Sequence, residues 1–226
     1  IMLSLGVIVI VSYIIGSFPT SIIVGRLLKG IDIREHGSGN AGGTNVFRVL
    51  GPGPGIFVMV FDALKGFAAT FWVSRIVIDP LPFDQGLVMI FAGVGAIIGH
   101  IWTIFAGFRG GKGVGTAAGM LAALFPKALL ICLAIFFIVL FTSKIVSLSS
   151  MSAAVALPIT LSIFKFALNM PVQTSLYIFS FIAAVLIIFT HRANIKRLLN
   201  GTENKFGKKK KALSLIHISE PTRPTL

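Results

Sequence analysis

Long apolar runs constrain this chain more than any other feature of its sequence. The first extends from about Leu3 to Leu28, and others of similar length begin near Ile56 and Gly86. A helix needs about 20 such residues to cross the hydrocarbon core of a bilayer. The runs are continuous and do not alternate, which excludes a transmembrane β-barrel. The sequence therefore predicts an all-α, polytopic membrane protein.

The composition agrees with this class. Of 226 residues, 55% are hydrophobic and 12% are charged, which is about half the charged fraction of a soluble domain. The formal net charge of +13 is concentrated in short segments between or after the apolar runs. This pattern indicates cytoplasmic loops beside anionic headgroups, and we expect no nucleic-acid partner. The single cysteine, Cys132, lies in an apolar run, where a thiol is inert.

Charge on the connectors predicts the topology. The apolar segments are about 3–28, 56–78, 86–108, 114–125, 128–142, 145–165 and 172–189. The connector Asp79–Gln85 contains acids and no Lys or Arg, so we expect it outside the cytoplasm. The basic turn at Lys112 and the basic tail after Thr190 both belong in the cytoplasm, which requires an even number of crossings between them. We predict seven transmembrane helices, with the N-terminus extracytoplasmic and the C-terminus cytoplasmic.

Neither end of the chain changes this prediction. The first segment has no basic n-region and no cleavage site, so we expect it to stay in the membrane and not to act as a signal peptide. Residues 1–211 are expected to form a single integral membrane domain. Residues 212–226, ALSLIHISEPTRPTL, are neither basic nor periodic and resemble a translated adapter or cloning scar. We give them no functional role.

The stretch His36–Arg48, HGSGNAGGTNVFR, is polar and lies between two apolar segments. Its glycines permit positive φ, so that successive N–H groups can form an anion-binding concavity. Arg48 adds a planar fork suited to phosphate. The stretch predicts a phosphate-binding loop, and the alternative is a flexible polar turn between two membrane helices. The other residues expected to take part are Gly37, Ser38, Gly39, Asn40, Gly42, Thr44 and Asn45.

Two further polar motifs are expected on the same membrane face. In the first, Gly110, Gly111 and Gly113 flank Lys112, and glycines beside a cation at a helix start favour an anion site. In the second, His191 and Asn194 are three residues apart, on one helical face. Three such motifs predict a site that binds more than one phosphate. The histidines show no metal-ligand spacing, so no metal is expected.

Segment 56–78 contains Asp62 and Lys65, which are three residues apart and therefore on one helical face. Ionisable residues at membrane depth are costly and usually face a polar cavity or each other. The spacing predicts an internal ion pair that borders the site, or alternatively a pair near the headgroups.

Together these motifs resemble the bacterial acyl-phosphate:glycerol-3-phosphate acyltransferases, membrane enzymes that make lysophosphatidic acid. They occur in the family's order and span nearly the whole chain up to about Lys211. The matching stretches are 16–20 (GSFPT), 37–48 (GSGNAGGTNVFR), 61–66 (FDALKG), 99–100 (GH), 108–116 (FRGGKGVGT) and 191–206 (HRANIKRLLNGTENKF).

The resemblance implies a reaction and a location. A fatty acyl group moves from acyl phosphate to the 1-hydroxyl of glycerol 3-phosphate, giving lysophosphatidic acid and phosphate, the first acylation step of bacterial phospholipid synthesis. It also implies the bacterial cytoplasmic (inner) membrane, an active site facing the cytoplasm, and neither cofactor nor metal. The implied partners are glycerol 3-phosphate, acyl phosphate and membrane lipids, with the soluble enzyme that forms acyl phosphate as a further candidate.

The family's catalytic residues map onto Ser38, Arg48, Lys112, His191 and Asn194. In this scheme Arg48 and Lys112 neutralise phosphates, and the other three orient glycerol 3-phosphate. Backbone N–H groups around 37–42 and 110–113 bind the phosphate oxygens. The residues expected to bind substrate are Gly37, Gly39, Asn40, Gly42, Thr44, Asn45, Gly110, Gly111 and Gly113.

Two other functions remain to be weighed. Broken helices with basic ends also suit a transporter or exchanger of organic phosphates. The polar motifs cluster on one face and not at the membrane midplane, which favours an interfacial enzyme. A CoA-dependent acyltransferase would carry His-x-x-x-x-Asp, but the residues five after His36, His100 and His191 are Ala41, Phe105 and Lys196.

Overall fold

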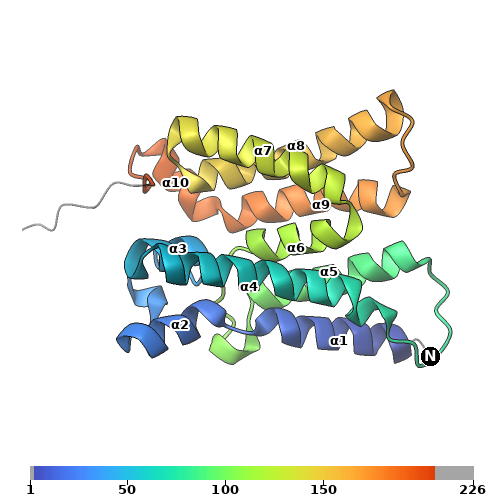
Figure 1. Cartoon of the computed structure of the whole chain (residues 1–226), viewed down its shortest axis with the longest axis horizontal. Coiled ribbons are helices and arrows are strands. Elements are labelled where there is room, and N and C mark those ends of the chain that lie inside the picture. The colour runs from blue at the N-terminus through green and yellow to red at the C-terminus, as the bar shows by residue number, and fades with distance from the viewer. Residues whose placement is uncertain (1–2, 207–226) are drawn as a thin grey trace, which may run out of the picture.

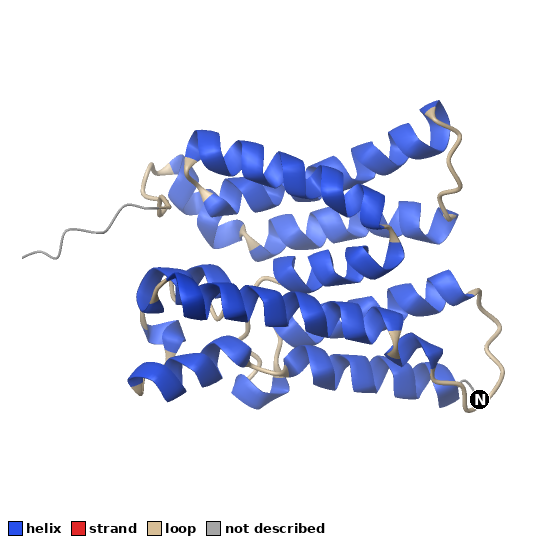
Figure 2. Ribbon diagram, in the orientation of Figure 1, coloured by secondary structure: helices blue, strands red, loops and turns tan. Residues whose placement is uncertain are grey.

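The computed structural model describes residues 3–206. Over this range the fold is all-α and contains no strand, as Figure 2 shows. The class predicted from the apolar runs is therefore confirmed. The tail at 212–226 lies outside the described residues, as do residues 207–211 of the expected domain.

The longer helices run roughly along one axis (Figure 1). α1, α4 and α5 pack together in one half of the bundle, α7, α8 and α9 form the other half, and α6 lies between them. The helices are α1 (Leu3–Ser17), α2 (Thr20–Lys29), α3 (Gly43–Leu50), α4 (Pro52–Phe71), α5 (Gln85–Ile101), α6 (Val114–Leu124), α7 (Pro126–Ser143), α8 (Val146–Ser162), α9 (Thr174–Thr190) and α10 (Arg192–Leu199).

Every apolar segment of the sequence forms a helix, but the helices differ in length. Within residues 3–206, five helical stretches are long and apolar enough to cross a membrane, or six if α9 and α10, which meet at 60°, count as one bent span. α6 has 11 residues and is therefore about 16 Å long, roughly half the hydrocarbon thickness. The chain is a multi-pass membrane protein, and its seven-crossing topology stays a prediction.

A break divides the first apolar segment into α1 and α2. Pro19 lies between them, and proline cannot donate to a helical ladder. The carbonyls freed at the break find side-chain donors on α4 and in the connection that follows α5. The Thr103 hydroxyl donates to the Ser17 carbonyl, and the Lys65 ammonium lies 3.3 Å from the Phe18 carbonyl oxygen. The break thus receives the partners that backbone groups need inside a membrane.

Candidate active site

Asn45 holds the first polar loop in its folded shape. Its side chain is 1% exposed. The amide oxygen accepts from the Ser38 N–H at 2.8 Å, and the amide nitrogen donates to the carbonyls of Ile33 and His36 at 2.9 Å each. Gly37, at φ +62°, lies so close that a Cβ there would come within 2.3 Å of the Asn45 oxygen. The polar atoms of Asn45 therefore serve the loop backbone.

This loop leads directly into α3, whose N-terminal end provides free donors. Within residues 3–206, the N–H groups of Gly43 and Thr44 have no hydrogen-bond acceptor. A helix N-terminus also carries a partial positive charge, which favours anions. Arg48 follows one turn later and makes no hydrogen bond or ion pair with the described residues. Burial lowers the pKa of the Arg48 guanidinium below its usual value, but arginine remains a cation at physiological pH.

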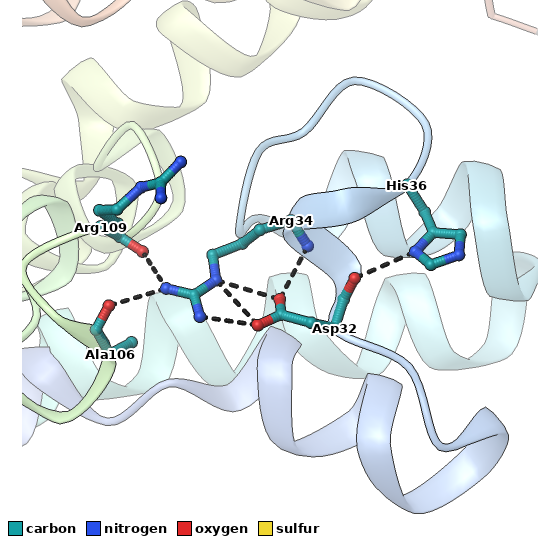
Figure 3. Close-up of polar contacts among 5 residues, drawn as sticks. All are labelled: Asp32, Arg34, His36, Ala106 and Arg109. Carbon is teal, nitrogen blue, oxygen red and sulfur yellow. Dashed lines mark hydrogen bonds and ion pairs between the residues drawn. The ribbon is translucent and has the colours of Figure 1, made fainter.

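Arg34 connects the first polar loop to the second, as Figure 3 shows. Its guanidinium forms a two-point ion pair with Asp32, with Nε–Oδ1 at 3.0 Å and Nη2–Oδ2 at 2.6 Å. Its remaining nitrogen donates to the carbonyl of Ala106 at 2.7 Å. The hydrogen-bonded ion pair with Arg34 lowers the pKa of the Asp32 carboxyl to about 2. Arg34 therefore holds the two loops together. Its nitrogens already donate to protein acceptors, so we assign it no role in substrate binding.

The second loop turns back on the end of α5. The N–H of Gly110 donates to the Ile101 carbonyl, and the N–H of Gly111 donates to the His100 carbonyl, both at 3.0 Å. These two N–H groups were expected to bind phosphate, but in the structure they hold the turn. The turn presents the Lys112 side chain to the third motif.

Lys112 meets the third motif at Asn194. The Lys112 ammonium donates to the Asn194 side-chain oxygen. The Asn194 amide nitrogen donates in turn to Glu203 Oε1 at 2.8 Å, and Glu203 Oε2 pairs with Arg197 Nε at 2.7 Å. Glu203 was not among the predicted site residues, although it belongs to the stretch that carried the resemblance. A turn at Gly201, with φ +67°, returns the chain toward α10.

Two properties of this motif bear on its chemistry. His191 is 2% exposed, and its Nδ1 lies 2.7 Å from the Ile187 carbonyl oxygen. A carbonyl only accepts, so Nδ1 carries the proton and Nε2 is left as an acceptor. Burial lowers the pKa of Lys112 to about 8. The nearby Glu203 carboxylate acts to raise this pKa, and the cations of Arg197 and Arg48 act to lower it further. The Lys112 ammonium therefore loses its proton at a lower pH than an ordinary lysine does.

One cavity of about 440 Å³ brings the three motifs together. The residues predicted as catalytic, Ser38, Arg48, Lys112, His191 and Asn194, all line it. So do Asn40, Gly42, Thr44, Asn45 and Gly113 from the predicted substrate-binding set. The remaining four, Gly37, Gly39, Gly110 and Gly111, do not line it and shape the two loops instead.

An apolar cavity of about 110 Å³ adjoins the polar one between α6, α7, α8 and α9. Its wall is almost entirely aliphatic and aromatic, and Cys132 belongs to it. The two cavities share the wall residues Val114, Ala118, Leu133, Phe136 and Ser150. The polar groups therefore lie next to an apolar cavity, and the shared residues form part of the wall of both.

The Asp62–Lys65 pair is internal, as one of the two sequence-based alternatives predicted. The ammonium lies 2.9 Å from the carboxylate, and both side chains are buried. Asp62 and His100 line the polar cavity. The described residues contain no cluster of three or more His, Cys, Asp or Glu that could hold a metal ion.

Known proteins are similar to this chain in sequence. The sequence profile of the family described as glycerol-3-phosphate acyltransferase matches residues 6–201. Curated proteins of that name from Chlorobium phaeobacteroides (strain BS1) and Chlorobaculum tepidum are each 46% identical to the chain. The first match covers 90% of this chain and 97% of that protein, and the second covers 92% and 100%.

Solved structures give the same result. A crystal structure of PlsY (YgiH), an integral membrane glycerol 3-phosphate acyltransferase in its glycerol 3-phosphate form, superposes with a TM-score of 0.77 at 36% identity. The match covers 90% of this chain and 96% of that one. The lysophosphatidic acid form of the same enzyme superposes with a TM-score of 0.75 at 35% identity. On this evidence of profile, sequence and structure, the chain belongs to the glycerol-3-phosphate acyltransferase family.

Proposed function

We propose that the protein transfers a fatty acyl group from acyl phosphate to the 1-hydroxyl of glycerol 3-phosphate, giving lysophosphatidic acid and phosphate. The observation that carries this proposal is the single cavity at which Ser38, Arg48, Lys112, His191 and Asn194 converge beside an apolar space. Related proteins are named for the acceptor, and one was solved with the acceptor and with the product.

In the reaction, the hydroxyl oxygen attacks the acyl carbon and the bond from that carbon to the phosphate oxygen breaks. Phosphate leaves, and the hydroxyl proton passes to a substrate phosphate. Among residues 3–206, the carboxylates that line the cavity are those of Asp62 and Glu203, and both are ion-paired. The donor is already activated, so catalysis can depend on positioning and on stabilising developing negative charge.

The cavity offers a role for each polar group. Lys112 and Arg48 neutralise the phosphates, and the free N–H groups of Gly43 and Thr44 add donors at the start of α3. His191 Nε2 accepts from a substrate hydroxyl, and Ser38 and Asn194 orient the same molecule. Asn45, Gly110 and Gly111 hold the loops that carry these groups.

The apolar cavity suits the fatty chain of the donor and of the product. It begins at Val114, two residues after Lys112, and extends along the length of α6 to Leu124. A chain in this space has its reactive end near the polar groups. Burying each methylene group there contributes about 0.8 kcal/mol to binding.

We also place the protein in the bacterial cytoplasmic membrane, with its polar cavity facing the cytoplasm and seven crossings in a single domain over residues 1–211. α2, α3, α10 and the turn between α7 and α8 lie at one end of the bundle (Figure 1). Basic residues there include Arg26, Lys29, Arg48, Lys144 and Arg197. At the opposite end, Ser4 near the N-terminus bonds Asp79 at 2.7 Å. Basic connectors favour the cytoplasmic side.

A mixed-donor assay tests the reaction. Purified protein in lipid would receive labelled glycerol 3-phosphate with palmitoyl phosphate or palmitoyl-CoA, each with a metal chelator. We expect lysophosphatidic acid from the phosphate donor alone. Product from palmitoyl-CoA alone would show that the acyl donor is a CoA thioester and not an acyl phosphate. No product from either donor, in protein with an intact thermal transition, would favour the alternative of an organic-phosphate transporter, which uptake into sealed vesicles would reveal.

The cytoplasmic face is also where a soluble acyl-phosphate-forming enzyme would deliver its water-insoluble product. Co-sedimentation of that enzyme with proteoliposomes, compared with protein-free liposomes of the same lipid, tests this partner. Equal binding to proteoliposomes and to protein-free liposomes would contradict a direct interaction between the two proteins.

A further inference from the structure

We propose that His100, held in place by Asp62, is a positioning residue for Lys112. In this view the imidazole is a spacer that fixes the Gly110–Gly111 turn and so sets where the Lys112 ammonium enters the cavity. The inference rests on the proposed function, because there Lys112 binds the phosphate of glycerol 3-phosphate.

The first part of the argument is the buried pair on α4. Asp62 and Lys65 are each 5% exposed, and their charged atoms lie 2.9 Å apart. Buried charges persist inside a membrane protein when each has a partner. Lys65 has a second contact with the Phe18 carbonyl at the break between α1 and α2. The carboxylate of Asp62 is therefore fixed from one side by a tethered cation.

His100 lies on the other side of the same carboxylate. Its Nδ1 is 3.6 Å from Asp62 Oδ1, and the imidazole is 7% exposed. This distance is longer than a normal hydrogen bond, so the contact is electrostatic. It nevertheless defines which edge of the ring faces α4 and which edge faces the loop.

The opposite edge of the ring lies against the second polar loop. A Cβ placed on Gly111 would come within 2.1 Å of His100 Nε2, so the ring and the Gly111 backbone are in direct contact. The Gly111 N–H also donates to the His100 carbonyl at 3.0 Å. One residue thus holds Gly111 through its backbone and its side chain, and Lys112 is the next residue along the chain.

The consequence concerns the acceptor site. Lys112 must extend from this turn to Asn194, on the far side of the cavity. If the imidazole is removed, the turn can retreat toward Asp62 and carry the ammonium away from the phosphate. Misplacement by about 1 Å is enough to reduce catalysis about a hundredfold. The acyl donor, whose chain lies between α6 and α9, should be affected less.

His100→Ala tests this proposal, because it removes the ring and leaves the Asp62–Lys65 pair intact. We expect the KM for glycerol 3-phosphate to rise about tenfold or more, with less than about threefold change in the KM for acyl phosphate. A second variant, Asp62→Asn with Lys65→Met, removes both charges together, so that no single charge is buried. It should shift the acceptor KM in the same direction. Thr70→Val is the matched control, since it is a buried polar residue on α4 far along the helix from Asp62.

A double-mutant cycle separates positioning from general loss of structure. In a Lys112→Arg background, His100→Ala should change the acceptor KM by less than about threefold, because both changes act on one group. Full additivity would overturn the proposal, and so would a wild-type acceptor KM in His100→Ala. If His100→Ala lowers the unfolding temperature, His100→Gln, which retains much of the side-chain volume, should keep the acceptor KM within about threefold of the wild type, and a tenfold rise in that variant would overturn the spacer role. Formation of lysophosphatidic acid from acyl phosphate by the wild-type protein tests the proposed function separately from these variants.

Discussion

Lys112 donates a hydrogen bond to the side-chain oxygen of Asn194, although the two residues are 82 positions apart in the chain. This contact joins the loop after α5 to the start of α10 across the polar cavity. Glu203 accepts from the Asn194 amide nitrogen and so fixes which end of the amide faces Lys112. The cation is therefore held by a neutral oxygen, which a substrate phosphate can replace.

Asn194→Asp tests this reading. A carboxylate beside Lys112 would compete with the substrate phosphate and repel Glu203, so we expect kcat/KM for glycerol 3-phosphate to fall by about 10²-fold or more. Steady-state kinetics at varied acceptor concentration measure the effect. Asn200→Ala, an exposed asparagine at the end of α10, is the control and should behave like the wild type. Equal kinetics for Asn194→Asp and the wild type would contradict the assignment.

The pH dependence of acceptor binding follows from the pKa of Lys112, which burial lowers to about 8. A lysine is charged below its pKa, so its contribution to phosphate binding is present below about pH 8 and is lost as the pH rises through this value. The acceptor phosphate is already a dianion there, with a second pKa of about 6. We expect its KM to rise about tenfold per pH unit above pH 8.

Lys112→Arg provides the matching control, because arginine stays charged over this range. The acceptor KM of that variant should be nearly independent of pH between 7 and about 9.5. Initial rates of lysophosphatidic acid formation, measured at several pH values for both proteins, make the comparison. A parallel rise in both would assign the titration to another group.

Arg48 is predicted to act through its charge, since within residues 3–206 it has no protein partner. Arg48→Ala should lower kcat/KM by about 10²–10³-fold, and Arg48→Lys should recover part of the loss. Turnover of detergent-purified protein with palmitoyl phosphate measures this. Arg109→Ala, an exposed arginine of the second loop, is the control. Near wild-type turnover in both Arg48→Ala and Lys112→Ala would exclude the proposed phosphate contacts.

The apolar cavity predicts a dependence on chain length. Ala154 on α8 lines this cavity, and Ala154→Phe would fill part of it. Each methylene kept out of the cavity costs about 0.8 kcal/mol, or about a fourfold loss in kcat/KM. Long-chain acyl phosphates should therefore lose more activity than short ones. Val155→Phe changes the neighbouring residue, which is 44% exposed on the membrane side of α8, and should leave the chain-length profile unchanged. Identical chain-length profiles for the two variants would contradict the assignment of this cavity to the acyl chain.

The sequence by itself determined the class of this protein and the identity of its polar motifs. Helices form wherever long apolar runs occur, because a helix satisfies its backbone hydrogen bonds within its own segment. Pro19 interrupts the first run for a similarly local reason, since proline removes a backbone donor. The spacing of Asp62 and Lys65 predicted an ion pair on one helical face, and the structure confirms that the pair is internal.

Only the tertiary structure decided which polar groups are free. Gly110 and Gly111 had the composition of an anion-binding turn, but their N–H groups donate to carbonyls at the end of α5. Asn45 resembled a substrate ligand, yet its side chain holds its own loop. Glu203 joins the site through Asn194 and Arg197, and His100 joins it through Asp62 and Gly111. Whether a donor is free depends on every neighbour that packs against it, and those neighbours are set by helix packing across the whole chain.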